Sequence, residues 1–341
     1  MGIIHLLKKT LYILIGLLIL VSQAYGKNLD HSKQVKLKVV ILPVLSFAPF
    51  FVAEEEGYFA EQGLQIEFIR MNKAAQAIPA LSQGQLDVVG GGVSFGILNA
   101  LVRGAKIKFV GDKGYFASKN CSFLTLMARQ DLVKSGKLEN VVQIKGRRIV
   151  LDPTNFEGYF IETLISKVGL TLADLEPVDM PDVLLPEALK KGTIDLAVTA
   201  EPWVTRILQT ESAMNWVPSH QVLPDFQFGF LVYGPSLLEK NPDAGKRFMV
   251  AYLKAIRQFN HGKTARNLKT ISKFTELDQD FLRKACWPSF RGDGQINIPS
   301  VLDFQSWGFK KTLLDKVILP DQFWDPSFVK YANKVLGTTH R

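Results

Sequence analysis

Three segments place polar or aromatic side chains directly after a predicted buried strand, a position from which they can reach a small molecule. Residues 90–94 read Gly-Gly-Gly-Val-Ser. Glycine lets a ligand approach the backbone closely, and Ser94 can either cap the next helix or contact that ligand. Residues 152–155 end on Thr154 and Asn155, which carry the same two alternatives. The sequence leaves both choices open.

The third segment, residues 200–203, is the most distinctive because it combines a carboxylate with an indole. Glu201 offers a hydrogen-bond acceptor to a ligand, and Trp203 offers a stacking face. The structural alternatives are that Glu201 interacts with the dipole of the following helix and that Trp203 belongs to the core. We favour ligand contact by one of the two, with Phe47 and Tyr159 as further aromatic walls.

Histidine and cysteine motifs for catalysis or metal binding are missing from the sequence. The five histidines form no H-x-x-x-H pair, and the two cysteines form no C-x-x-C. The glycine run is not a nucleotide-binding fingerprint, because Phe95 stands where the third glycine belongs. We therefore expect a binding protein rather than an enzyme, with no metal and no cofactor.

Strand-like runs alternate with helical runs through the first two thirds of the mature chain, which predicts α/β lobes with mostly parallel sheets. After residue 233 the pattern becomes mainly helical. The predicted strands are Val35–Leu42, Gln65–Ile69, Val88–Gly90, Ile107–Gly111, Phe123–Ala128, Arg148–Leu151, Leu196–Thr199 and Gly229–Tyr233.

An internal repeat indicates two similar lobes. The pattern A-L-x-x-G-x-[LI]-D-[VL] begins at Ala80 and again at Ala188, 108 residues later, and residues 46–47 match residues 155–156 at an offset of 109. In each copy a helix ends at a glycine, and an aspartate precedes a buried strand. Equivalent strand ends are then expected to face each other across a cleft, where α/β sheets bind ligands.

The N-terminus has the three-part layout of a secretory signal. Lys8 precedes an uncharged apolar run over residues 11–21, and Ala24 and Gly26 fit a small-residue cleavage site. We expect a signal peptide over residues 1–26, cleavage near Gly26 rather than retention as an anchor, and a periplasmic mature chain.

Charge and cysteine content narrow the partners further. The formal net charge of +9 favours anionic small molecules, whereas the lack of a dense basic run argues against nucleic acid.

Cys121 and Cys286 are the two cysteines. Their spacing gives no argument for pairing, so we expect two buried free thiols, although export would permit a disulfide.

Over roughly residues 35–336 the sequence resembles the solute-binding proteins of ABC importers for nitrate, sulfonates, taurine and thiamine-pyrimidine precursors. The order of the matching segments is more specific than any one of them. These segments are Ala53–Phe59, Gly63-Leu64, Ala80–Asp87, Asn99–Gly104, Gly111–Gly114, Gly169-Leu170, Ala188–Asp195, Glu201-Pro202, Asp293–Asn297 and Asp325–Phe328.

The resemblance implies a two-lobed periplasmic-binding-protein fold of type II. Lobe 1 would comprise residues 35–111 and 229–341, and lobe 2 residues 112–228, with crossovers near Gly111–Gly114 and Gln227–Gly229. A monomer would capture a small-molecule ligand by lobe closure and deliver it to an ABC transporter permease with its ATPase. Carried over by position, the ligand-binding residues are Ser46, Phe47, Asn72, Ser94, Thr154, Asn155, Glu201 and Trp203.

Two other functions stay open. Pyrimidine synthases for thiamine are similar to this family, but they carry a cysteine-rich active-site motif and are cytosolic. A sensor that reports a solute to a membrane receptor is the third candidate. The solute is also open: charge and helix N-termini favour an anion such as a sulfonate or nitrate, whereas Glu201 and the aromatic residues favour a heterocycle with N–H donors.

Overall fold

The structure of the chain is a computed structural model that describes residues 34–42, 44–71, 74–117 and 121–337. The described residues from Val35 onward form one compact unit. The predicted signal peptide, residues 1–26, lies outside the described residues. Among the described helices, none is long and apolar enough to cross a lipid bilayer.

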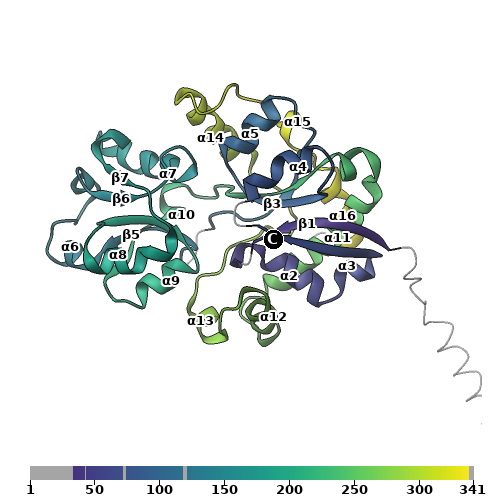
Figure 1. The fold of residues 1–341 in the computed structure, drawn as a ribbon, viewed down its shortest axis with the longest axis horizontal. Coiled ribbons are helices and arrows are strands. Elements are labelled where there is room, and N and C mark those ends of the chain that lie inside the picture. The colour runs from purple at the N-terminus through teal and green to yellow at the C-terminus, as the bar shows by residue number, and fades with distance from the viewer. Residues whose placement is uncertain (1–33, 43, 72–73, 118–120, 338–341) are drawn as a thin grey trace, which may run out of the picture. The chain divides into compact units, whose positions relative to one another are not determined.

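The strands of the described residues form two five-stranded sheets (Figure 1). The first sheet has the order β2 (Leu64–Arg70), β1 (Val35–Ile41), β3 (Val88–Gly92), β10 (Gly229–Tyr233) and β4 (Lys108–Asp112). The second has the order β7 (Glu176–Val178), β6 (Arg148–Val150), β8 (Leu196–Ala200), β5 (Leu124–Arg129) and β9 (Ala213–Pro218).

Both sheets are mixed, which corrects the expectation of mostly parallel sheets. In each sheet three strands run parallel, β2-β1-β3 and β7-β6-β8, and two antiparallel pairings follow. Strand β10 pairs antiparallel with β3 and β4, and β5 pairs antiparallel with β8 and β9. The reason is topological. The chain enters the second sheet at β5 directly from the first sheet, and it returns to the first sheet at β10 directly from the second. The edge strands β7 and β9 were not predicted from the sequence, because few of their residues are buried.

Helices cover the sheets, and the longest, α11, packs against α2, α3 and α16. The α-helices before β10 are α2 (Ala48–Glu55), α3 (Tyr58–Glu61), α4 (Ile78–Ser82), α5 (Phe95–Val102), α6 (Gln130–Lys134), α7 (Phe156–Ile165), α8 (Leu185–Lys191), α9 (Trp203–Leu208) and α10 (Ser219–Val222). Those after β10 are α11 (Pro242–Phe259), α12 (Ala265–Thr275), α13 (Gln279–Lys284), α14 (Ile298–Lys310), α15 (Pro320–Phe323) and α16 (Ser327–Leu336). Short 3₁₀ turns are η2 (Leu45–Phe47), η3 (Ala74–Ala77), η4 (Val141–Ile144), η5 (Ser166–Val168), η6 (Leu172–Asp174) and η7 (Asp182–Leu184), and η8 (Ser236–Lys240) is a π-helix.

The internal repeat has the same local structure in both copies. Gly84 and Gly192, just after α4 and α8, both have a left-handed backbone, with φ of 73° and 70°. Asp87 then accepts a hydrogen bond from a backbone N–H of β1 at 2.7 Å, and Asp195 accepts one from β6 at 3.1 Å. In each sheet the aspartate therefore fixes the start of one strand, β3 or β8, against its parallel neighbour.

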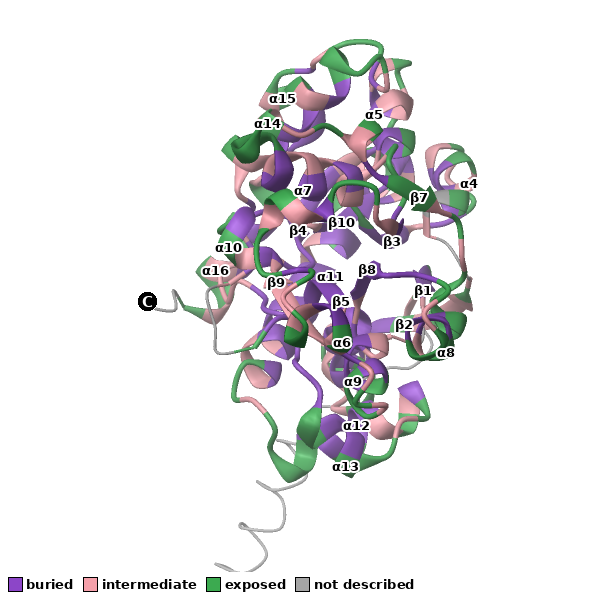
Figure 2. Ribbon diagram, turned by 90° about the vertical axis from the view of Figure 1, so that its left-hand side faces the viewer, coloured by how far each residue is buried: buried purple, intermediate pink, exposed green. Residues whose placement is uncertain are grey.

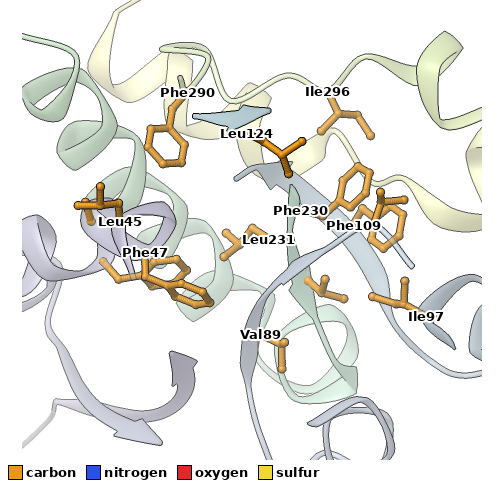
Figure 3. Close-up of a cluster of buried hydrophobic side chains, with 14 of the residues drawn as sticks. Leu45, Phe47, Val89, Ile97, Phe109, Leu124, Phe230, Leu231, Phe290 and Ile296 are labelled. Atoms are coloured by element: carbon orange, nitrogen blue, oxygen red, sulfur yellow. The ribbon is translucent and has the colours of Figure 1, made fainter. Parts of the chain in front are cut away.

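Burial follows the position of each strand in its sheet. The central strands β5 and β8 are almost wholly buried, whereas the edge strand β7 is largely exposed (Figure 2). One hydrophobic cluster contains side chains from both sheets, including Val89 of β3 and Leu124 of β5 (Figure 3). Within it the rings of Phe109 and Phe230 stack with their centroids 4.0 Å apart. The core is therefore continuous from the first sheet to the second.

Three chain segments meet near the crossovers. Tyr115 forms isolated antiparallel bridges with Gln227 and with Ser289. The side-chain amide of Gln227 donates to the Asp112 carboxylate at 2.5 Å and to the Gly114 carbonyl at 3.1 Å. The two predicted crossover segments are therefore hydrogen-bonded neighbours. The lobe boundaries assigned from them stay a prediction.

Cys121 and Cys286 form a disulfide, which corrects the expectation of two buried free thiols. Cys286 is buried, whereas Cys121 is exposed. Their Cα atoms lie 5.7 Å apart, although 165 residues separate them along the chain. The spacing could not reveal this pair, because only the fold brings the start of the β5 segment beside the segment that follows α13.

Candidate functional site

Lys113, directly after β4, lies against Ser46 and Phe47, which follow β1. Its Nζ atom is 3.2 Å from Ser46 Oγ, within hydrogen-bonding distance, and 3.8 Å from the centroid of the Phe47 ring. All three side chains are buried, with exposed fractions of 3% for Lys113, 9% for Ser46 and 2% for Phe47. The structure thus brings a buried amine to two of the predicted ligand-binding residues.

Lys113 was not among the predicted site residues, although it stands in the crossover segment Gly111–Gly114. Lysine is ordinarily exposed, and nothing in the sequence shows that this side chain folds over Gly90. A Cβ at position 90 would sit 2.8 Å from Lys113 Cε and 2.9 Å from Phe47 Cε1, so glycine there makes room for the lysine. The sequence suggested that the glycine run serves close ligand approach; at Gly90 it positions Lys113 instead.

Burial controls the ionisation of Lys113 and of its neighbour Asp112. Burial lowers the pKa of Lys113 from 10.5 to about 7, and the charge of Asp112 opposes that shift. Burial also raises the pKa of Asp112 from 3.8 to about 6, against hydrogen bonds from the Gln227 side chain and from the backbone N–H groups of Arg291 and Gly114. The Asp112 carboxylate is therefore engaged by these three donors.

Ser94 and Tyr159 both border an aromatic cluster on α14. Ser94 precedes Phe95, whose ring stacks on Phe304 with 4.4 Å between centroids. Tyr159 of α7 meets the same Phe304 ring edge-on at 5.6 Å. Trp307 completes the cluster, since its ring centroid lies 5.8 Å from that of Phe95 and 5.5 Å from that of Tyr159. Helix α14 therefore links α5, beside the first sheet, to α7, beside the second.

Residues 92–96 read Gly-Val-Ser-Phe-Gly and so match the G-x-S-x-G pattern, which the expectation of a non-catalytic chain overlooked. In a nucleophile elbow the serine sits on a sharp, strained turn and is activated by a histidine. Here Ser94 has an extended backbone, with φ of −156° and ψ of 154°. Its hydroxyl does not cap α5. The motif is therefore not arranged as a nucleophile elbow, and a ligand contact by Ser94 stays a prediction.

Thr154 and Asn155 interact with the loop and helix in which they lie. The Asn155 side chain accepts a hydrogen bond from the Glu157 N–H at 2.9 Å as the N-cap of α7. The Thr154 hydroxyl donates to the Asp152 carboxylate at 2.6 Å. The structure therefore shows the capping role for Asn155, one of the two alternatives left open by the sequence. Ligand contacts by Thr154 and Asn155 remain predictions.

Carboxyl groups stand at the strand ends of the second sheet. Glu157 accepts a hydrogen bond from the Asp152 N–H at 2.7 Å, and Asp182 accepts one from the Thr199 hydroxyl at 3.2 Å. Burial raises the pKa of Glu157 to about 7; the Asp152 N–H opposes this shift, and the charges of Asp182 and Asp152 add to it. When ionised, such groups repel an anion.

Glu201 is hydrogen-bonded to Cys286 and to Thr205. Its carboxylate accepts hydrogen bonds from the Cys286 N–H at 2.8 Å, the Thr205 hydroxyl at 2.8 Å and the Thr205 N–H at 3.1 Å. Burial raises the pKa of Glu201 against these hydrogen bonds. Trp203 is half-buried, and its ring centroid lies 5.2 Å from the Arg206 guanidinium. These contacts give both residues structural partners, and their contact with a ligand stays a prediction.

We expect Glu201→Gln to lower the free energy of unfolding by about 2–3 kcal/mol, because a charged acceptor of several donors becomes an amide that presents N–H to one of them. The exposed control Glu187→Gln, which loses an i,i+4 ion pair with Lys191, should cost less than about 0.5 kcal/mol. Chemical denaturation measures both variants. If both variants lose a similarly small free energy of unfolding and only Glu201→Gln binds the solute more weakly, Glu201 contacts the ligand instead of supporting the fold.

Contacts among the described residues join several of the predicted site residues to three different neighbours. Ser46 and Phe47 lie at Lys113, Ser94 and Tyr159 border α14, and Glu201 lies beside the disulfide. Asn72 lies outside the described residues. The Lys113 group, which consists of Lys113, Ser46 and Phe47, combines burial, charge and incomplete hydrogen bonding, so we take it as the candidate recognition site.

A family model described as NMT1/THI5 like matches residues 45–261. This chain belongs to the NMT1/THI5-like family. A curated relative of this NMT1/THI5-like chain, the bicarbonate-binding protein CmpA of Synechococcus elongatus, is 22% identical over 245 residues, which cover 64% of this chain and 52% of the relative. The chain thus spans about half the length of the curated relatives it matches.

Solved structures show the fold of this NMT1/THI5-like chain. The ligand-binding component of an ABC-type import system from Staphylococcus aureus has a TM-score of 0.70 at 17% identity and covers 88% of this chain and 99% of its own. The alkanesulfonate-binding protein SsuA from Xanthomonas axonopodis pv. citri, bound to MOPS, has a TM-score of 0.67 at 17% identity, with 86% and 99% covered. The desulfurization enzyme DSZB has a TM-score of 0.62 at 14% identity, with 89% and 100% covered.

The two-lobed periplasmic-binding-protein fold of type II, predicted from the sequence, is confirmed by these similarities. An enzyme also shares the fold, so the fold alone does not separate binding from catalysis in the NMT1/THI5-like family.

Proposed function

We propose that this chain is the solute-binding component of an ABC importer. It captures a small organic or inorganic anion, such as a sulfonate or nitrate, by lobe closure and delivers it to a membrane permease with its ATPase. The observation that carries the proposal is the pair of matching sheets joined by adjacent crossovers, in a member of the NMT1/THI5-like family. Two lobes joined in this way can close around a ligand by a hinge motion.

An anionic solute is supported by charge and by the relatives. The chain carries a formal net charge of +9, and the buried amine of Lys113 lies at the strand ends of the first sheet. Proteins similar to it are named for binding bicarbonate and alkanesulfonate. A thiamine-pyrimidine precursor is the alternative solute.

Two observations favour binding over catalysis. Both cysteines of the chain are joined in the disulfide, so it offers no thiol nucleophile. The G-x-S-x-G segment lacks the strained serine backbone of a nucleophile elbow. The pyrimidine-synthase-like enzyme is therefore the weaker candidate.

Export to the periplasm, with cleavage near Gly26, belongs to the same proposal. Disulfides form and persist in oxidising compartments such as the periplasm, and Cys121 and Cys286 form one. The mature chain would act there as a monomer that meets the permease from outside the cytoplasmic membrane.

Thermal unfolding of the purified exported protein tests the function against methanesulfonate, taurine, nitrate, bicarbonate and a thiamine pyrimidine, with sodium chloride as the ionic-strength control. One anion should stabilise the protein by about 2.7 kcal/mol at 100 times its Kd. Small-angle scattering should then show a smaller radius of gyration, and denaturation should release the anion unchanged. Stabilisation by the pyrimidine alone would favour the alternative solute, and recovery of an altered product would favour the enzyme.

A further inference from the structure

Lys113 is a buried amine with unused donor capacity. An ammonium group has three N–H donors. Among the described residues, Ser46 Oγ is the hydrogen-bond partner of Nζ, at 3.2 Å. The Phe47 ring, 3.8 Å from Nζ, adds the electron-rich face that cations favour. Two of the three N–H donors of Lys113 therefore have no acceptor among the described residues.

The neighbouring carboxylate does not supply that acceptor. The Asp112 oxygens accept hydrogen bonds from the Gln227 side chain at 2.5 Å, the Arg291 N–H at 2.8 Å and the Gly114 N–H at 3.0 Å. Lys113 directly follows Asp112, the last residue of β4. In the described part of the chain, Lys113 forms no ion pair with a carboxylate. Its counter-charge must come from elsewhere.

The surroundings hold the amine in place without neutralising it. Gly90 of β3 leaves space that a Cβ would close to 2.8 Å from Lys113 Cε, and the Phe47 ring lies on the same side. A glycine, a phenyl ring and the Ser46 hydroxyl thus pack on the lysine side chain. The charge of the adjacent Asp112 favours the protonated amine. A buried charge without a paired partner is costly, which is why such groups mark binding sites.

We propose that the Lys113 amine binds the anionic group of the solute, with Ser46 Oγ beside it and Gly90 and Phe47 holding the lysine in position. This inference rests on the proposed function and deepens it. A single amine matches a single negative charge, so the site should take monoanions such as sulfonates, nitrate or carboxylates in preference to dianions such as sulfate. The carboxyl groups at the second sheet would then face the uncharged or donor end of the solute.

A coupling between protons and binding follows from this geometry. Without a solute, burial lowers the pKa of Lys113 to about 7. A bound anion supplies the missing counter-charge and raises that pKa, so binding above pH 7 requires uptake of one proton. Affinity should be constant just below pH 7 and fall about tenfold for each pH unit above it. Asp112 titrates at about 6, so the useful range begins above that value.

Calorimetric titration with methanesulfonate, nitrate and acetate, which stay ionised throughout, tests the inference between pH 6.5 and 9. Wild-type affinity should fall about 100-fold over this range, with uptake of one proton at pH 9 shown by buffers of different ionisation enthalpy. Lys113→Met should bind at least about 30-fold more weakly at pH 6.5. Lys113→Arg, which stays charged, should remove the pH dependence of whatever affinity it retains. The exposed control Lys36→Met should keep both the affinity and the slope.

The possible results separate the inference from the proposed function. Wild-type binding with no pH dependence and no proton uptake would overturn the role of Lys113 while leaving an anion-binding protein. The same holds if Lys113→Met is folded and binds with wild-type affinity. Binding of none of the three monoanions by the wild-type protein would overturn the proposed anion function together with this inference. If Lys113→Met does not fold, the pH dependence of wild-type affinity and the number of protons taken up still test the role of Lys113.

Discussion

Lys113→Met is expected to raise the free energy of unfolding near pH 7 by about 3 kcal/mol. In the unfolded chain the lysine is protonated below 10.5, whereas in the empty folded protein it is protonated only below about 7. Folding near neutral pH must therefore release a proton or bury a charge. Each unit of pKa difference corresponds to about 1.4 kcal/mol, and loss of the Ser46 hydrogen bond offsets part of the gain.

The pH dependence of this gain has a definite sign. The destabilisation by Lys113 is complete below pH 7, shrinks as the pH rises from 7 to 10.5, and vanishes above 10.5 because both states are then neutral. Chemical denaturation of both proteins at pH 7 and pH 10 measures the difference, with Lys36→Met as the exposed control that should change little. A less stable Lys113→Met protein, or a stability difference that does not depend on pH, would contradict the buried-amine account.

Removal of the disulfide by the double change Cys121→Ser and Cys286→Ser should lower the free energy of unfolding by about 2–5 kcal/mol. The bond links residues 165 positions apart, so it restricts a large loop of the unfolded chain. It also holds Cys121, just before β5, next to the segment whose Cys286 N–H donates to Glu201. The native arrangement of that junction therefore loses support when the bond is removed.

Thermal unfolding with and without dithiothreitol provides the control for the disulfide prediction. The reductant should lower the midpoint of the wild-type protein toward that of the double variant and leave the variant unchanged. Anion affinity at 25 °C should be retained, because the proposed anion-binding residues, Lys113 and Ser46, do not include either cysteine. Equal stability of the oxidised wild-type protein and the variant would show that the bond does not constrain the chain.

Local patterns predicted much of the fold. The repeated pattern at Gly84, Asp87, Gly192 and Asp195 could be recognised in the sequence because each glycine ends its helix with a left-handed backbone, which is a local conformation. The strands β1 and β6 that bond to the two aspartates lie 49 and 47 positions away and could not be named from the pattern. The strand-helix alternation likewise gave the two α/β lobes. The antiparallel strands β5 and β10 could not be assigned in this way, because their direction depends on how the chain passes between sheets.

The candidate site depended on contacts between distant residues and was therefore harder to predict. Lys113 reaches Ser46 across 67 positions, and a lysine gives no sequence signal that it will be buried. Glu201 was predicted as a ligand contact because it follows a strand, yet its oxygens accept from Thr205 and Cys286. Strand-end position placed Ser46 and Phe47 among the predicted ligand-binding residues, which stays a prediction, but it could not show that Lys113 lies beside them.

The most direct test of the account is a crystal structure of the exported protein with the anion that gives the largest thermal stabilisation. We expect an oxygen of this anion within hydrogen-bonding distance of Lys113 Nζ, with Ser46 Oγ nearby. We also expect residues beside the second sheet to close over the opposite end of the solute. An anion bound away from Lys113, with its amine still paired with Ser46 alone, would contradict the account.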